Sequence, residues 1–282
     1  MEWLLAPVVV GFVARALLAG LLVSALCALA GTWVVLRGMA FLGDAMSHGM
    51  LPGVALAALL GGNLFLGASA GAITMALEVS ALTRSSRLSR DTSIGLLFAG
   101  MLSIGVILIS HSKSFAVDLT AFLFGDVLAV RRTDLLLLAI ALAVALVLAA
   151  LGHRAFVALA FDRRKAATLG LRPQAANVLL SALLTLALVA SFQVVGTLLV
   201  FGLLVAPPAA MTMWARRIPA IMIGAAVLGG LATLAGLLIS WHFDTAAGAS
   251  IAATAVAGFF ISAAAARLRD LRPAAVAEPP VP

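Results

Sequence analysis

An acidic side chain and an imidazole, those of Asp44 and His48, lie within the otherwise apolar stretch from Arg37 to Gly53. On a helix these residues are i and i+4, so both side chains lie on one face at a spacing that lets them hold one ion. Asp supplies a hard oxygen and neutral His a borderline nitrogen, a pair that suits Zn²⁺, Mn²⁺ or Fe²⁺ better than Ca²⁺ or Cu⁺. Two ligands do not complete a site. The others must come from water, backbone, another span or a symmetry-related copy.

A structural alternative for this pair stays open. Asp44 can pair with Arg37, seven residues earlier on nearly the same helix face, while His48 hydrogen-bonds a neighbouring helix. Ionisable groups at membrane depth usually mark a substrate pathway, so we favour the ligand interpretation. His242 and Asp244 are further candidates, as ligands at the outer mouth of the pathway. The alternative for them is an aromatic-belt anchor beside a solvated histidine.

Prolines predict two helix breaks in apolar segments. Pro52 lacks the N–H that would bond the carbonyl of His48, so it can kink the helix directly after the candidate site. Pro207 and Pro208 likewise free the carbonyls four residues before them in another segment. Broken helices at membrane depth often line a pathway, and we expect both breaks to do so, although proline kinks also occur in purely structural spans.

The elements that must position these residues are membrane helices. The chain is 64% hydrophobic and 10% charged, with a mean hydropathy of +1.20, too apolar for a soluble globule of 282 residues. Apolar runs of about 20 residues are long enough to cross the bilayer as helix, so the predicted fold is an all-α polytopic bundle. We expect nine spans, or eight if the split at Gln193–Gly196 is absent: 8–35, 39–61, 63–82, 92–110, 134–152, 175–193, 194–213, 219–241 and 246–267.

Small residues indicate where these helices pack closely. Gly67 and Gly71 form a G-x-x-x-G pattern, which favours close approach of two helix backbones.

Cys27 is the sole cysteine and lies in an apolar run, which excludes a disulfide framework and a thiolate metal site. The net charge of +7 falls between spans rather than in a patch with aromatic residues, so nucleic acid is not an expected partner.

The basic loops predict the orientation. If nine segments alternate, most Arg and Lys residues fall on one side, which is cytoplasmic by the positive-inside rule. The amino terminus is then outside, and the first apolar run is a retained span rather than a signal peptide. Residues 1–270 form a single membrane domain, followed by a frayed cytoplasmic tail, residues 271–282. With Arg37 at the inner interface, His48 lies about 16 Å deeper, near the middle of the bilayer. Residues 111–133 predict a re-entrant or interfacial helix at the outer mouth, or an ordinary amphipathic loop helix.

A second feature of interest is the cytoplasmic segment 161–173. Asp162 can cap a short helix that Gly170 and Pro173 end. The basic residues Arg163, Arg164 and Lys165 and the apolar Leu169 fit insertion into a partner's groove, the alternative being a helix that lies on lipid headgroups. No phosphate-binding loop of the G-x-x-x-x-G-K-S/T type occurs, so ATP hydrolysis must belong to another chain.

Several motifs, in order along nearly the whole chain, resemble the permease subunits of bacterial ABC importers for zinc, manganese and related divalent metals. They are Gly31-Thr-Trp-Val-Val-Leu-Arg37, Met39-Ala-Phe-Leu-Gly-Asp44-Ala-Met-Ser-His48, Leu51-Pro52-Gly53, Phe122-Leu-Phe-Gly125-Asp126, Phe161-Asp162 to Leu169-Gly170, Val195-Gly196-Thr-Leu-Leu-Val with Ala206-Pro207, and Asp244-Thr-Ala-Ala-Gly248.

The resemblance implies a homodimeric or paired permease of the bacterial cytoplasmic membrane, similar in fold to cobalamin and iron-siderophore importer permeases. It implies two cytoplasmic ATPase subunits, an extracytoplasmic metal-binding protein, a metal site at Asp44 and His48, and ATPase docking by residues 162–170. Family members often carry an acidic residue after Phe161-Asp162, where this chain has Arg163-Arg164-Lys165, so the partner contacts are expected to differ.

The resulting hypothesis is a non-enzymatic permease subunit of an ATP-driven importer of Zn²⁺ or Mn²⁺, or of Fe²⁺. The alternative is a self-sufficient transporter of metal or protons that uses Asp44 and His48 as a relay. The residues do not distinguish between these metals, or between a site within one subunit and a site shared by two.

Overall fold

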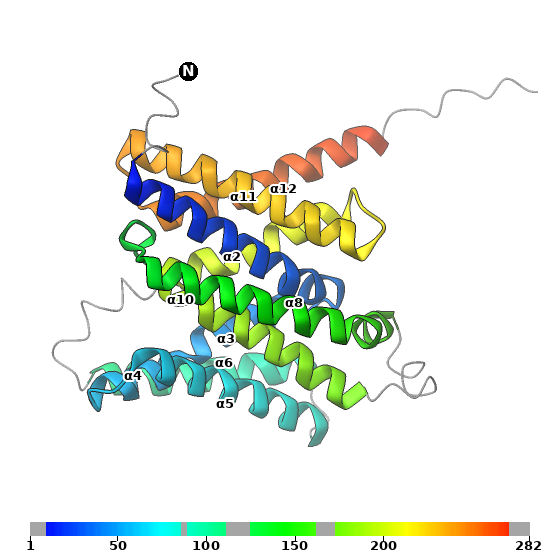
Figure 1. Ribbon diagram of the computed structural model, residues 1–282. Helices are drawn as coiled ribbons and strands as arrows, with labels where there is room; N and C mark the ends of the chain where they lie inside the picture. The colour runs from blue at the N-terminus through cyan, green and yellow to red at the C-terminus, as the bar shows by residue number, and fades with distance from the viewer. Residues whose placement is uncertain (1–9, 86–88, 111–124, 162–172, 271–282) are drawn as a thin grey trace, which may run out of the picture.

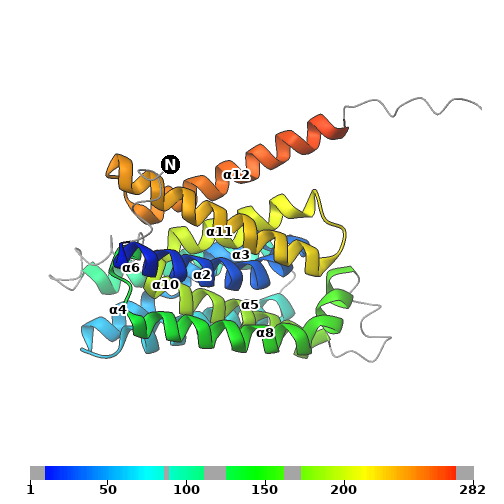
Figure 2. The same ribbon diagram turned by 45° about the horizontal axis from the view of Figure 1, so that its top comes forward.

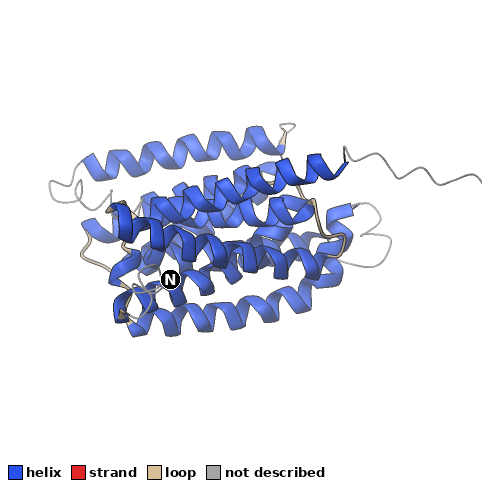
Figure 3. Ribbon diagram, turned by 90° about the horizontal axis from the view of Figure 1, so that it is seen from above, coloured by secondary structure: helices blue, strands red, loops and turns tan. Residues whose placement is uncertain are grey.

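The computed structural model describes residues 10–85, 89–110, 125–161 and 173–270. Within these ranges every regular element is a helix and no strand is present (Figure 3). The all-α membrane bundle expected from the sequence is confirmed. In chain order the elements are α2 (Gly11–Leu36), α3 (Ala40–Gly49), α4 (Leu51–Leu59), α5 (Leu64–Ser85), α6 (Arg90–Ser110), the short 3₁₀ helix η1 (Val127–Ala129), α8 (Arg132–Phe161), α10 (Pro173–Thr212), α11 (Ile218–Phe243) and α12 (Ala247–Asp270).

Eight helical stretches of the described chain are long and apolar enough to cross a membrane, and α10 contains two of them. The helices α3 and α4 are each too short to cross alone. Together they run from Ala40 to Leu59, about 30 Å at the standard helical rise, and they occupy the predicted segment 39–61. Taken end to end, the pair has the length of a broken span, in addition to the eight candidates.

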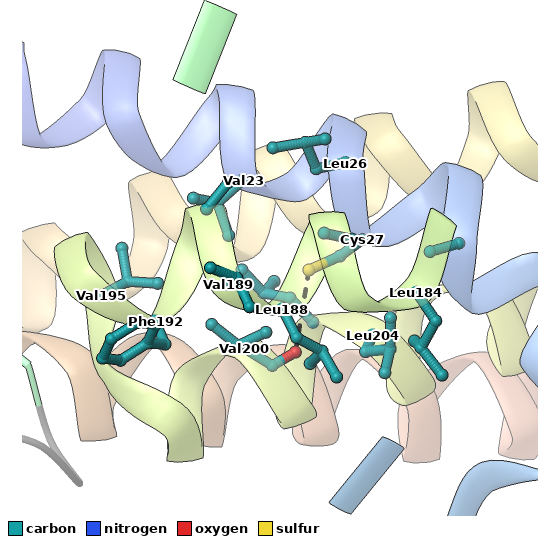
Figure 4. Packing of buried hydrophobic residues seen from close by; sticks show 14 of the residues in the cluster. Val23, Leu26, Cys27, Leu184, Leu188, Val189, Phe192, Val195, Val200 and Leu204 are labelled. Atoms are coloured by element: carbon teal, nitrogen blue, oxygen red, sulfur yellow. Dashed lines mark hydrogen bonds between the residues drawn. The ribbon is translucent and has the colours of Figure 1, made fainter. Parts of the chain in front are cut away.

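The 40-residue helix α10 is a hairpin of two spans. Gly196, with φ 74° and ψ 163°, interrupts it, and the two halves run in opposite directions (Figures 1 and 4). This conformation is essentially restricted to glycine. Gly125, which also has a positive φ, lies against the backbone of Val195 and Gly196, where a Cβ would collide. The split predicted at residues 193–196 is confirmed.

The break expected at Pro207 and Pro208 is not found, because α10 continues as helix through both residues. The carbonyl of Leu204, four residues before Pro208, lies against Gly31 of α2, where an added Cβ would overlap its oxygen. A glycine allows this close approach, and Cα–H groups are weak donors to carbonyl oxygens. The neighbouring helix thus accommodates a carbonyl that proline leaves without its usual donor.

The long helix α2 lies at the centre of the bundle and contacts α8, α10 and α11 (Figure 1). Cys27 of α2 is fully buried, and its thiol donates to the carbonyl of Val200 on α10 at 3.7 Å (Figure 4). The helices α4, α5 and α6 form a group on one side, and α11 and α12 lie on the other, with α12 at the edge of the molecule (Figures 1 and 2). The helix α3 lies between these parts, since it contacts α2, α5, α6 and α10.

The expected close packing at Gly67 and Gly71 is confirmed. A Cβ at Gly67 would overlap the carbonyl oxygen of Gly53 on α4, and one at Gly71 would lie 3.0 Å from the carbonyl oxygen of Met50. The start of α5 therefore packs backbone to backbone against α4, directly after the break in the span. This contact fixes the position of α4 relative to α5.

The two ends of the bundle differ in charge. At one end lie the carboxyl-terminal ends of α2, α5, α8 and α12 and the start of α10 (right in Figure 1). We call it the basic end, because its helix ends and loops carry Arg37, Arg154, Arg216, Arg217, Arg267 and Arg269. The opposite end carries Arg15, Arg131 and Arg132. The side chain of Arg15 donates to the carbonyl of Val130 at 3.1 Å, a contact that the sequence did not predict.

Candidate metal-binding site

The candidate site lies on α3, a helix of ten residues that is interrupted from its neighbours in the chain at each end. Before it, Gly38 has a φ of +61° and turns the chain from α2 into α3. After it, Met50 separates α3 from α4, in whose first turn Pro52 lies. The break predicted from Pro52 is present.

Asp44 and His48 face each other on α3. Asp44 Oδ1 lies 3.6 Å from His48 Nε2, and the two side chains are 30% and 26% exposed, respectively. Two ligand atoms, each about 2.1 Å from a tetrahedral metal, are about 3.4 Å apart. The pair thus already has nearly the separation at which one cation can bridge the carboxylate and the imidazole.

The imidazole of His48 is held by an aromatic contact with another helix. Phe98 of α6 packs edge-on against it, with ring centroids 5.5 Å apart and an interplanar angle of 78°. Phe98 in turn contacts Phe41, at a centroid distance of 5.8 Å. The buried Nδ1 of His48 has no hydrogen-bond partner among the described residues. The ring is therefore oriented by packing, with Nε2 directed towards Asp44.

The structural alternative for the pair is not found. Arg37 does not pair with Asp44; its Nη2 donates to Oδ1 of Asn177 on α10 at 2.8 Å. The alternative partner for His48 on a neighbouring helix is also absent from the described residues, since Nδ1 makes no hydrogen bond there. Within the described chain, the side chain that faces the Asp44 carboxylate is the imidazole of His48, at 3.6 Å.

In the described part of the chain, the site consists of two candidate ligands, Asp44 and His48. No group of three or more His, Cys, Asp or Glu side chains with metal-binding geometry occurs in the described ranges. The donors present, one carboxylate and one imidazole, fit a divalent transition metal carried as substrate. They leave most of its coordination positions open.

The other sequence candidates lie apart from this pair. His242 and Asp244 are at the carboxyl-terminal end of α11, opposite the basic end. The Nδ1 of His242 lies 2.8 Å from the carbonyl oxygen of Leu238, and Asp244 is an exposed residue with a left-handed φ of 50° that ends the helix. The predicted docking residues 162–170 fall outside the described chain. Phe98 and Asn177 were missed by the sequence analysis, because nothing near them in sequence marks their contacts with residues 48 and 37.

Comparison with known proteins identifies the family. The profile of the ABC 3 transport family matches residues 10–266. The chain belongs to this family. It is 39% identical over 241 residues to the manganese transport system membrane protein MntC of Halalkalibacterium halodurans, a match that covers 85% of this chain and 82% of the relative. A probable iron transport system membrane protein of Haemophilus influenzae is 36% identical, with 95% and 98% covered.

A solved structure supports the same assignment. The fold matches a chain of PsaBC from Streptococcus pneumoniae in complex with Fab, with a TM-score of 0.82 and 33% identity over 93% of this chain and 94% of that chain. The resemblance to divalent-metal ABC importer permeases, drawn from short motifs, is confirmed at the level of family and fold.

Proposed function

We propose that this ABC 3 family protein is the membrane permease of an ATP-driven importer and that its substrate is a divalent transition metal. The observation that carries the proposal is the facing pair of Asp44 and His48 on a short helix in a broken span. His48 is the ninth of the 20 residues from Ala40 to Leu59, and so lies midway along that span. Broken spans at the membrane midplane are where transporters commonly bind their substrates.

Manganese is the first expected substrate, with iron and zinc as the alternatives to test. Named relatives are manganese and iron transport membrane proteins, and an Asp–His pair accepts each of these metals. No metal is held permanently. The ion binds at Asp44 and His48 during passage and is then released.

A second copy of the chain completes the site. The Asp44 carboxylate is 30% exposed at membrane depth, where a charge facing hydrocarbon costs several kcal/mol. A homodimer that covers this face removes the carboxylate from lipid. If its axis passes close to α3, the second Asp44 and His48 raise the number of protein ligands to four, enough for a tetrahedral metal.

The basic end faces the cytoplasm in this proposal, because Arg and Lys are enriched in cytoplasmic loops. The amino terminus is then outside and the carboxyl terminus inside. Asp162, Arg163, Arg164, Lys165, Leu169 and Gly170 dock on a cytoplasmic ATPase subunit, and an extracytoplasmic metal-binding protein delivers the ion. The ion first meets the end that carries His242 and Asp244.

The test is uptake of ⁵⁴Mn²⁺, ⁵⁵Fe²⁺ or ⁶⁵Zn²⁺ into proteoliposomes that contain the permease with its ATPase and its binding protein. We expect ATP-dependent uptake, and we expect Asp44→Ala and His48→Ala each to reduce it at least about tenfold, since even outer-shell changes at metal sites cost about 10- to 100-fold. Glu78→Ala, which removes a half-buried acid on α5, is the matched control and should retain uptake.

Two results would contradict the proposal. Full uptake by both site variants would remove the metal-site assignment. Metal accumulation by the permease alone, without ATPase or ATP, would instead support the ion-coupled transporter.

A further inference from the structure

A charged hydrogen bond ties the start of α10 to the turn that precedes α3. Arg37 ends α2, and its Nη2 donates to Oδ1 of Asn177, the fifth residue of α10, at 2.8 Å. The two residues are 140 positions apart, and the contact is partly buried. Hydrogen bonds from a guanidinium are stronger than neutral ones and have fixed geometry. The bond therefore links the two elements more firmly than ordinary surface contacts would.

The helix α3 is short and is joined to the end of α2 by a hydrogen-bonded turn. In this turn Gly38 has a positive φ and the N–H of Met39 donates to the carbonyl of Val34, and at its other end Met50 separates α3 from α4. A cavity of about 50 Å³ lies beside the Arg37–Asn177 contact and gives the side chains of α3 room to shift. Its lining includes Leu42, Met46, Ser80, Gln174 and Ser181.

Asn177 lies close to the segment proposed to dock on the ATPase. α10 begins at Pro173, directly after residues 162–172 in the chain. The first turns of α10, which carry Asn177, are therefore the part of the described chain that follows this segment. Asn177 accepts a hydrogen bond from Arg37, which lies one residue before Gly38 and seven residues before Asp44.

We propose that the Arg37–Asn177 hydrogen bond couples the start of α10 to α3, and so lets movement driven by the ATPase reposition Asp44 and His48. Arg37 and Asn177 are positioning residues in this scheme, because they act on the metal ligands through α3. The inference rests on the proposed function, since it assumes that ATP hydrolysis by a partner drives uptake.

The test compares metal uptake with ATP hydrolysis in the assembled complex. In Asn177→Ala, we expect the amount of metal imported per ATP hydrolysed to fall about tenfold, the factor expected for loss of a hydrogen bond to a charged group. The hydrolysis rate and the membrane abundance should stay near those of wild type. In Asn177→Asp, a carboxylate can still accept from Arg37, so we expect coupling to be retained.

A matched control exists near the same end of the bundle. Trp214 Nε1 donates to Ser262 Oγ at 2.7 Å and joins the α10–α11 connection to α12 without touching α3. Ser262→Ala removes this interhelical bond and should leave the coupling ratio unchanged.

The results separate the two proposals. Wild-type coupling in Asn177→Ala, or an equal loss of coupling in Asn177→Asp and Ser262→Ala, would overturn the role of the Arg37–Asn177 bond while leaving the importer intact. Absence of ATP-dependent uptake in wild type would overturn the proposed function and this inference with it.

Discussion

The backbone contact between α4 and α5 predicts a graded response to a single added methyl group. At Gly67 a Cβ would overlap the carbonyl oxygen of Gly53 and lie 2.6 Å from the Cβ of Ala57, so the two helices must separate. Overpacking of this kind lowers the free energy of unfolding by about 1–3 kcal/mol. The higher helix propensity of alanine offsets up to about 1 kcal/mol of this loss. At Gly71 the nearest atom is 3.0 Å away, and a smaller shift suffices. At Gly100 nothing lies within 4 Å.

The sole cysteine supplies the assay. Cys27 is completely buried in α2, so a thiol-reactive fluorophore labels the detergent-solubilised protein only as it unfolds. We expect the melting temperature to fall from Gly100→Ala, at or above wild type, through Gly71→Ala to Gly67→Ala, by roughly 2–4 °C per kcal/mol. If Gly67→Ala melts as high as Gly100→Ala, the two helices are not in backbone contact and the described packing is wrong.

Three further variants test the two interruptions and the continuous helix at Pro207 and Pro208. Gly196→Ala places a Cβ in a glycine-only conformation, so we expect a lower melting temperature in the same assay and less protein in the membrane; unchanged values would contradict the hairpin. Pro52→Ala restores an N–H four residues after His48, so we expect a straighter α3–α4 joint, lower uptake and no loss of stability; wild-type uptake would show that the break has no functional role. Combined Pro207→Ala and Pro208→Ala should leave uptake unchanged, because the helix is already continuous there, and a loss of uptake would contradict this.

Local sequence was sufficient to predict the spans, because the thickness of the hydrocarbon core sets their length. The run 39–61 was predicted as one span, and the structure divides it at Met50, close to the proline that indicated a break. Pro207 and Pro208 in α10 predicted a break for the same reason, but the helix continues through them. The difference is tertiary: Gly31 of α2 lies against the Leu204 carbonyl, and nothing near Pro208 in sequence indicates that neighbour.

The geometry of the candidate pair could also be predicted, because the i to i+4 spacing brings two side chains together on any helix. The observed 3.6 Å between Asp44 and His48 agrees with that expectation. Their surroundings could not be predicted. Phe98 reaches the imidazole from another helix, and Arg37 binds Asn177 rather than the nearby Asp44. Both contacts depend on how α3 packs against α6 and α10.

The short length of α3 has a physical consequence for the pair it carries. In a continuous span, the directions of Asp44 and His48 would be fixed by the whole helix. Here the backbone is interrupted on both sides, so contacts with other elements set the orientation: Phe98 against the imidazole, and Asn177 on the arginine before α3. The His48 ring is held by packing, whereas no hydrogen bond from another helix to the Asp44 carboxylate occurs in the described chain, and that carboxylate remains partly exposed. If the pair binds a metal as proposed, the imidazole supplies a nitrogen held by packing and Asp44 an oxygen that an approaching ion can reach.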